Sequence, residues 1–164
     1  MMGTNPDVHL AMTRRDKNEY YLAVCKSIAF GSKCPEGKQH GAIAVKNKRM
    51  ISTGYNGPAS GMPHCSPTIC PLDAYKKANN GKKDFSLCPA VHAEINVLVT
   101  AAQVGTVLVD SVIYVTKKPC NDCIKALRNL ALGGVVFPKD DDEDDGTHFL
   151  LVGPELLQKI ELEY

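Results

Sequence analysis

The chain has 164 residues, of which 44% are hydrophobic, enough for one domain with a sizeable core. Its 19 basic and 18 acidic residues give a net charge of +1, so no general field for binding a polyanion such as long nucleic acid is evident. No apolar run reaches the length of a membrane span, and the first dozen residues lack the apolar core of a signal peptide. We therefore expect a cytoplasmic protein, in which seven cysteines indicate metal binding or free thiols before disulfides.

The first part of the chain predicts a helix followed by a β-hairpin. Apolar residues recur at near-helical spacing between residues 14 and 32. Cys25 is expected in the buried face of this helix, because a free cysteine behaves as a small hydrophobe. Two β-rich runs, at 42–45 and 50–55, flank the polar segment 46–49 and predict the hairpin.

The second part of the chain alternates helices and strands. In order, we expect a helix at 94–103, a strand at 111–116, a helix at 120–132, a strand at 135–137, an acidic loop at 140–145, a strand at 149–152 and a helix from Pro154. The chain shows no internal repeat and no linker. This alternation predicts a single α/β domain over residues 1–164, a three-layer α/β/α sandwich with a central mixed sheet of about five strands.

The most informative motif combines His-Ala-Glu at 92–94 with Pro-Cys-Asn-Asp-Cys at 119–123. One histidine and two cysteine thiolates supply three zinc ligands, whereas a structural zinc site closes its tetrahedron with a fourth protein ligand. The fourth position is left to water, whose pKa Zn²⁺ lowers towards neutral pH. Glu94, a carboxylate off the metal, would move the protons of that water. The expected ligands of this catalytic zinc are His92, Cys120 and Cys123.

His-x-Glu followed by Pro-Cys-x-x-Cys is the signature of zinc deaminases that act on cytosine and adenine bases. Beyond this signature, residues 20–137 resemble the deoxycytidylate (dCMP) deaminases of the cytidine deaminase superfamily, which implies a cytidine deaminase-like fold. The matching strings are Gly41-Ala42, ISTGYNGP at 51–58, His64-Cys65, CPAVHAE at 88–94, YVT at 114–116 and Pro119-Cys120. The last 27 residues match less clearly, and Val97 stands where the family usually has alanine.

The resemblance implies hydrolytic deamination of dCMP to dUMP and ammonia, which supplies the precursor of thymidylate. Activated water would attack C4 of the cytosine, while Glu94 takes the proton of that water and then protonates N3 and the departing amine. A related deaminase of free cytidine or deoxycytidine, or of nucleic-acid bases, shares this chemistry, but a nucleic-acid channel would be basic. A zinc-stabilised binding module is a further alternative, which leaves the open ligand set unexplained.

The resemblance also assigns residues to the substrate. Asn56 would bind the sugar and the backbone of Ala93 the base, with Tyr114 and Thr116 lining the same end of the sheet. The Tyr-Asn-Gly-Pro string is equally typical of a turn, so a purely structural Asn56 stays open. A monophosphate needs a cation nearby, and Lys117 is the candidate, although a loop lysine is commonly solvated surface.

A cysteine-rich insert spans about 61–88 and poses a second metal question. Four cysteines outside the catalytic motif suit a closed tetrathiolate, which would anchor this long insert. By resemblance, many dCMP deaminases carry such a site, and free thiols are the alternative. The expected ligands of this structural zinc are Cys34, Cys65, Cys70 and Cys88, with His64 as an alternative ligand.

The resemblance further implies allosteric control, with dCTP as activator and dTTP as inhibitor at a subunit contact, commonly in a hexamer. A triphosphate with Mg²⁺ needs basic groups, and the candidates near the hairpin are Lys33, Lys38 and Arg49, which would otherwise be solvated surface charges. The expected partners are therefore dCMP, these two effectors and further copies of the chain, with no membrane and no long nucleic acid.

Overall fold

The centre of the protein is a five-stranded mixed sheet. The computed structural model describes residues 17–35, 37–65, 70–82, 84–138 and 149–152. The sheet has the order β2-β1-β5-β6-β7. Its strands are β1 (Gly41–Lys46), β2 (Arg49–Tyr55), β5 (Val112–Val115), β6 (Gly134–Pro138) and β7 (Phe149–Val152). Because β5 and β6 run parallel and the other neighbours antiparallel, the predicted mixed sheet is confirmed.

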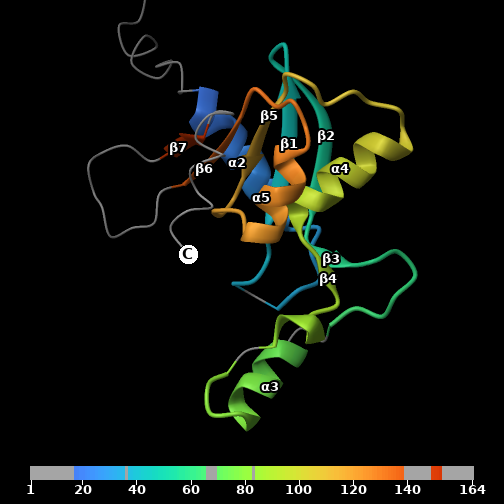
Figure 1. The fold of residues 1–164 in the computed structure, drawn as a ribbon, viewed down its shortest axis with the longest axis vertical. Coiled ribbons are helices and arrows are strands. Elements are labelled where there is room, and N and C mark those ends of the chain that lie inside the picture. The colour runs from blue at the N-terminus through green and yellow to red at the C-terminus, as the bar shows by residue number, and fades with distance from the viewer. Residues whose placement is uncertain (1–16, 36, 66–69, 83, 139–148, 153–164) are drawn as a thin grey trace, which may run out of the picture.

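Helices cover both faces of this sheet (Figure 1). Helix α2 (Lys17–Ala29) packs on one face, and α4 (Ala93–Gln103) and α5 (Asn121–Arg128) pack on the other. The alternation of side chains along β5 divides the core in the same way, since Tyr114 packs with α2 while Ile113 packs with α4 and α5. The predicted three-layer sandwich is therefore confirmed.

Helix α2 lies very close to β1. Cys25 is fully buried, and its thiol donates a hydrogen bond to the carbonyl oxygen of Tyr114 at 3.3 Å. The predicted core position of this cysteine is confirmed. At the start of β1, a Cβ on Gly41 would overlap the carbonyl oxygen of Cys25. The absence of a side chain at Gly41 thus allows α2 to rest directly on the strand.

The insert contains structure that the sequence analysis did not predict. Helix α3 (Pro71–Ala78) stands away from the sandwich, and the short strands β3 (Gly57–Pro58) and β4 (Ala90–Val91) pair antiparallel at the base of the insert (Figure 1). A 3₁₀ turn at Phe85–Leu87 follows α3. No residue of α3 is buried, so packing leaves little trace in its sequence. The sequence does carry one signal of a helix start, because Pro71 occupies the first turn of α3, where proline is favoured.

One predicted helix boundary differs from the structure, and two predicted elements lie outside the described residues. Helix α5 ends at Arg128 and not at 132, because the amides of Asn129 and Leu130 donate to carbonyl oxygens three residues back, which tightens the last turn. The acidic loop at 140–145 and the helix expected from Pro154 lie outside the described residues. None of the described helices combines the length and apolar content that crossing a membrane requires.

Candidate active site

The N-termini of two helices bring the predicted zinc ligands together. His92 is the N-cap residue of α4, Cys120 is the N-cap residue of α5, and Cys123 lies in the first turn of α5. The amides of Asn96 and Ile124 donate to the carbonyl oxygens of His92 and Cys120 at 3.0 and 2.9 Å, which closes both first turns. The positive ends of the two helix dipoles lie at the ligands, where they favour negative charge.

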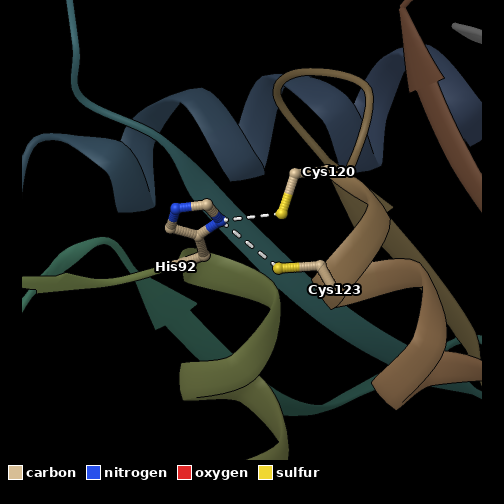
Figure 2. Close-up of side chains that lie close together, drawn as sticks. All are labelled: His92, Cys120 and Cys123. Atoms are coloured by element: carbon tan, nitrogen blue, oxygen red, sulfur yellow. Dashed lines mark hydrogen bonds between the residues drawn. The ribbon is translucent and has the colours of Figure 1, made fainter. Parts of the chain in front are cut away.

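The geometry of this ligand trio (His92, Cys120 and Cys123) fits a tetrahedral ion. Figure 2 shows Nδ1 of His92 facing both sulfurs, 3.3 Å from Sγ of Cys120 and 3.4 Å from Sγ of Cys123. In the described part of the chain, no other group of three histidine, cysteine or acidic side chains lies within 4.8 Å. Typical Zn–N and Zn–S bonds of about 2.1 and 2.3 Å separate such ligands by about 3.6 Å. Spacing and donor chemistry therefore suit Zn²⁺.

The electrostatics of the trio also call for a cation. The side chain of Glu94 is buried, and burial raises the pKa of its carboxyl group. Burial, followed by the charges of Glu94 and Cys120, raises the pKa of the Cys123 thiol. The desolvation and the two neighbouring groups thus oppose ionisation of the Cys123 thiol. A divalent cation would offset this cost, since a coordinating thiol loses its proton.

His92, Cys120 and Glu94 border a pocket of about 280 Å³. Glu94 is the one acidic residue among the described residues that line it. The cationic or titratable nitrogen side chains elsewhere on its walls are Lys38, His40, Lys117 and Lys118. Lys117 lines the same pocket as His92 and Cys120, and its predicted contact with a phosphate stays a prediction. The excess of positive groups suits a small ligand that carries negative charge.

Two further predicted substrate residues, Ala93 and Asn56, also line the pocket. The amide of Asn56 is already engaged, because its Oδ1 accepts from the backbone of His40 at 2.8 Å and its Nδ2 donates to the carbonyl oxygen of Lys38 at 2.8 Å. The same Nδ2 lies 3.2 Å from Sγ of Cys34. Asn56 therefore holds the loop before β1 at the pocket, and its predicted contact with a sugar stays a prediction.

Tyr114 is not brought to this site. Its hydroxyl donates to Oδ1 of Asn18 at 3.0 Å, and its ring centroid lies 4.9 Å from that of Tyr21, on the α2 face of the sheet. Val115, its neighbour in β5, lines the pocket instead. Successive residues of a strand point to opposite faces, so the substrate contact predicted for Tyr114 is corrected. Thr116 is not among the described lining residues, but its hydroxyl accepts from the amide of Gly41 at 3.2 Å and lies 3.4 Å from Nδ1 of His40, which lines the pocket. Its predicted substrate role stays a prediction.

The cysteine group of the insert (Cys34, Cys65, Cys70 and Cys88) lies along the same pocket. Burial raises the pKa of Cys34 and Cys65, and the charges of the other members of the group add to this effect. Among the described residues, no three of these sulfurs lie within 4.8 Å of one another. The four cysteines are thus gathered without a closed ligand geometry, and the structural zinc stays a prediction. The alternative ligand, His64, is exposed.

The three cationic side chains predicted for an effector site lie apart from one another. Nζ of Lys38 lies 2.6 Å from Oδ1 of Asp73. Lys33 is exposed in the same loop. Arg49 instead begins β2, beside the turn at the other end of the hairpin, and the six residues of β1 span about 17 Å. The three side chains therefore do not form one binding site within a single chain.

Comparison with known proteins identifies the family. A sequence profile described as the cytidine and deoxycytidylate deaminase zinc-binding region matches residues 15–139. The chain belongs to this deaminase family. The deoxycytidylate deaminase of Mycobacterium phage D29 is 36% identical over 133 residues, which cover 79% of this chain and 99% of that protein. ComE operon protein 2 of Bacillus subtilis is 31% identical over 129 residues, which cover 79% of this chain and 62% of that protein.

Solved structures support the deaminase fold. The dCMP deaminase of cyanophage S-TIM5, in complex with dCMP and dUMP, has a TM-score of 0.61 at 24% identity, and the match covers 96% of this chain and 95% of that chain. The cytidine deaminase of Burkholderia pseudomallei has a TM-score of 0.51 at 13% identity, with 87% and 96% covered. The fold class and the family predicted from the sequence are both confirmed.

His40 is a pocket residue of this deaminase that was missed in the sequence. It lines the site but belongs to no recognisable spacing pattern, whereas Lys118, which also lines the site, directly precedes Pro119-Cys120. His40 is separated from His92 by more than fifty residues, and a single histidine at the end of a loop carries no signal of its own. Only the pairing of β1 with β5 brings the loop that holds His40 next to the segment that holds Lys117.

Proposed function

We propose that the protein catalyses the hydrolytic deamination of dCMP to dUMP and ammonia. The observation that carries the proposal is the buried carboxyl group of Glu94, which borders the same pocket as His92 and Cys120 without belonging to the ligand trio. Support for this substrate comes from the relatives named deoxycytidylate deaminase and from the phage structure in complex with dCMP and dUMP. The net charge of +1 favours a free nucleotide over long nucleic acid.

The ligand trio would hold the zinc, which supplies an acidified water for attack on C4 of the cytosine. The proton transfers then fall to Glu94. Its raised pKa suits a group that takes a proton from the water and returns it. The carboxyl group would give this proton to N3, then take the proton of the hydroxyl formed at C4 and give it to the departing amine, so one side chain acts in turn as base and as acid. Water adds to the ring, ammonia leaves, and Glu94 ends the cycle as it began.

The pocket walls would bind the rest of the nucleotide. Ala93 and Asn56 both line the pocket, which supports a base contact from the backbone of Ala93 and a sugar contact from Asn56. Lys117 and Lys118 form no ion pair with any described residue, whereas Lys38 is paired with Asp73. Unpaired cations in a pocket with a single carboxylate favour a phosphate monoester. We assign the 5′-phosphate to the side of the pocket that carries Lys117.

The loss of cytosine absorbance tests this function on the zinc-loaded protein. The substrates are dCMP, deoxycytidine and a single-stranded oligonucleotide containing cytosine. We expect dCMP to be consumed fastest and Glu94→Gln to abolish turnover while zinc and fold are retained. Glu19→Gln, which changes an acidic residue of α2, is the matched control. Faster reaction of deoxycytidine or of the oligonucleotide would reject the substrate, and no reaction at all would favour a binding module.

We also propose a structural zinc on Cys34, Cys65, Cys70 and Cys88, with His64 as the alternative ligand. The shared position of the four cysteines along one pocket supports it. Helix α3 buries none of its residues, so the insert needs an anchor other than packing. Elemental analysis should find two zinc ions per chain in the unsubstituted protein. It should find one per chain in Cys70→Ser and two per chain in the control Cys25→Ala. A single zinc in the unsubstituted protein would reject the proposal.

Regulation is proposed on the family resemblance. We infer activation by dCTP with Mg²⁺ and inhibition by dTTP, within a homo-oligomer that we expect to be a hexamer. Because Lys33, Lys38 and Arg49 lie apart in one chain, an effector site that uses them needs residues from more than one copy. Turnover of dCMP with each triphosphate, together with sedimentation analysis, tests this. Unchanged rates with both effectors would reject the regulation and leave the deaminase function intact.

A further inference from the structure

His40 lines the pocket but belongs neither to the zinc deaminase signature nor to the ligand trio, so its role is not yet explained. It is half-buried at the end of the loop that precedes β1, and its side chain borders the pocket together with Lys117 and His92. It lies outside the ligand trio. A histidine placed in a candidate active site, but not on the metal, is available to bind a ligand directly.

The backbone of His40 is held from the β2 side. Its amide donates to Oδ1 of Asn56 at 2.8 Å, and its carbonyl oxygen accepts from the amide of Asn56 at 3.1 Å. Asn56 directly follows β2, so the rigid sheet fixes this loop residue. A group fixed in this way binds a ligand with little loss of conformational entropy.

The imidazole is oriented from the β5 side. Nδ1 of His40 lies 3.4 Å from Oγ1 of Thr116, and the same oxygen accepts from the amide of Gly41 at 3.2 Å. The hydroxyl can donate its own proton to Nδ1 while Oγ1 accepts from Gly41, and we adopt this arrangement. A neutral imidazole that accepts at Nδ1 carries its proton on Nε2. Nε2 is then the atom that can donate to a ligand in the pocket.

The surroundings of His40 are positive. Burial lowers the pKa of His40, and the charges of Lys117 and His92 lower it further. Glu94 is the one acidic side chain among the described lining residues, and it lies beside the ligand trio. Lys117 has no ion-pair partner among the described residues. A ligand group bound between His40 and Lys117 would therefore be an anion.

We propose that His40 and Lys117 form the subsite for the 5′-phosphate and so set the preference for a nucleotide over a nucleoside. The inference rests on the proposed dCMP deaminase function and names the residues that read its phosphate. Nε2 of His40 donates a hydrogen bond to one phosphate oxygen, and Nζ of Lys117 binds a second. Thr116 and Asn56 are positioning residues for His40.

Calorimetric binding of dUMP and of deoxyuridine to the zinc-loaded protein tests the subsite without turnover. His40→Asn preserves a polar group near the Nδ1 position and removes the Nε2 donor, whereas His40→Gln places an amide near the Nε2 position. We expect His40→Asn to weaken the binding of dUMP roughly tenfold more than the binding of deoxyuridine, as the loss of one hydrogen bond to a charged group predicts. His40→Gln should restore much of this difference. Lys26→Met, at an exposed lysine of α2 outside the pocket, is the control.

The outcomes separate this inference from the proposed function. If the unsubstituted protein deaminates deoxycytidine as well as dCMP, the proposed substrate fails. If it prefers dCMP but His40→Asn weakens dUMP and deoxyuridine by the same factor, only the His40 assignment is overturned. Should His40→Asn not fold, Lys117→Met decides, because this exposed side chain has no role in packing. An unchanged preference in Lys117→Met would overturn the subsite.

Discussion

Gly54 of β2 lies directly against the first turn of α4, next to Ala93. A Cβ added to Gly54 would lie 2.5 Å from the carbonyl oxygen of Ala93 and 2.6 Å from the amide nitrogen of Val97. Both atoms belong to the helix backbone, so neither can move aside as a side chain could. Ala93 stands between His92 and Glu94, and the contact therefore sets the distance of the metal ligand and the acid from the sheet.

We predict that Gly54→Ala moves α4 away from β2 and weakens zinc binding. Overpacking of this kind costs about 1–3 kcal/mol of stability. Because the shift separates His92 from Cys120 and Cys123, zinc affinity and turnover should fall together. Thermal unfolding and zinc titration measure both effects. The matched control is Gly57→Ala, since a Cβ on Gly57 meets nothing within 4 Å. Equal zinc affinity in both variants would contradict the prediction.

A second prediction concerns the pH dependence of zinc binding. Burial, Glu94 and Cys120 raise the pKa of the Cys123 thiol, so the zinc-free protein holds this proton at neutral pH. Zinc binds the thiolate and must release that proton, so affinity should rise with pH by roughly tenfold per pH unit for each thiol that loses a proton. Competition with a chelating dye between pH 6 and 8 measures this slope. An affinity that does not change over this range would show that the thiols are already ionised before zinc binds.

The alternation of elements and the metal motif predicted the layers and the ligand trio because both depend on local sequence. Helix N-termini at His92 and Cys120 follow from short-range periodicity, and the motif supplies its own chemistry. The position of Tyr114 depended on the strand pleat, which a matching string does not reveal. His40 depended on strand pairing between distant segments, for which the sequence carries no signal. Site residues were thus predictable where they belong to one local motif. They were missed where strand pairing brings distant segments together.

A third prediction follows from the salt bridge between Lys38 and Asp73. Lys38 joins the loop before β1 to α3, with its Nζ 2.6 Å from Oδ1 of Asp73 and 3.9 Å from Sγ of Cys70. The hydrogen bond from Lys38 lowers the pKa of the Asp73 carboxyl group. The salt bridge therefore stabilises the docking of α3 fully at pH values above the ordinary pKa of an aspartate. This stabilisation is lost as the pH falls through the lowered pKa of Asp73.

Lys38→Met should release α3 without unfolding the sandwich. Because both side chains are partly exposed, we expect little change in the melting temperature but faster amide exchange in α3. Hydrogen exchange measured by mass spectrometry resolves the two regions. Lys33→Met, which changes an exposed lysine of the same loop, should leave exchange in α3 unchanged. Equal exchange in the two variants would mean that the salt bridge does not hold the insert.

The buried thiol of Cys25 leads to a prediction at high pH. Burial raises the pKa of Cys25 from 9.0 to about 12. The folded protein thus keeps the thiol protonated where the unfolded chain ionises it. The free energy of unfolding should be unaffected by Cys25 below pH 9 and should fall as the pH rises from 9 to 12, by about 4 kcal/mol for a shift of this size.

Denaturant unfolding of the unsubstituted protein and of Cys25→Ala between pH 7 and 11 isolates this effect from the titration of tyrosines and lysines. At pH 7 the variant should be less stable by roughly 1 kcal/mol, because it loses a buried sulfur and the hydrogen bond to the carbonyl oxygen of Tyr114. Above pH 9 the difference should shrink and then reverse, since alanine has no proton to lose. Parallel curves over the whole range would show that Cys25 ionises without cost in the folded protein, which its complete burial between α2 and the sheet argues against.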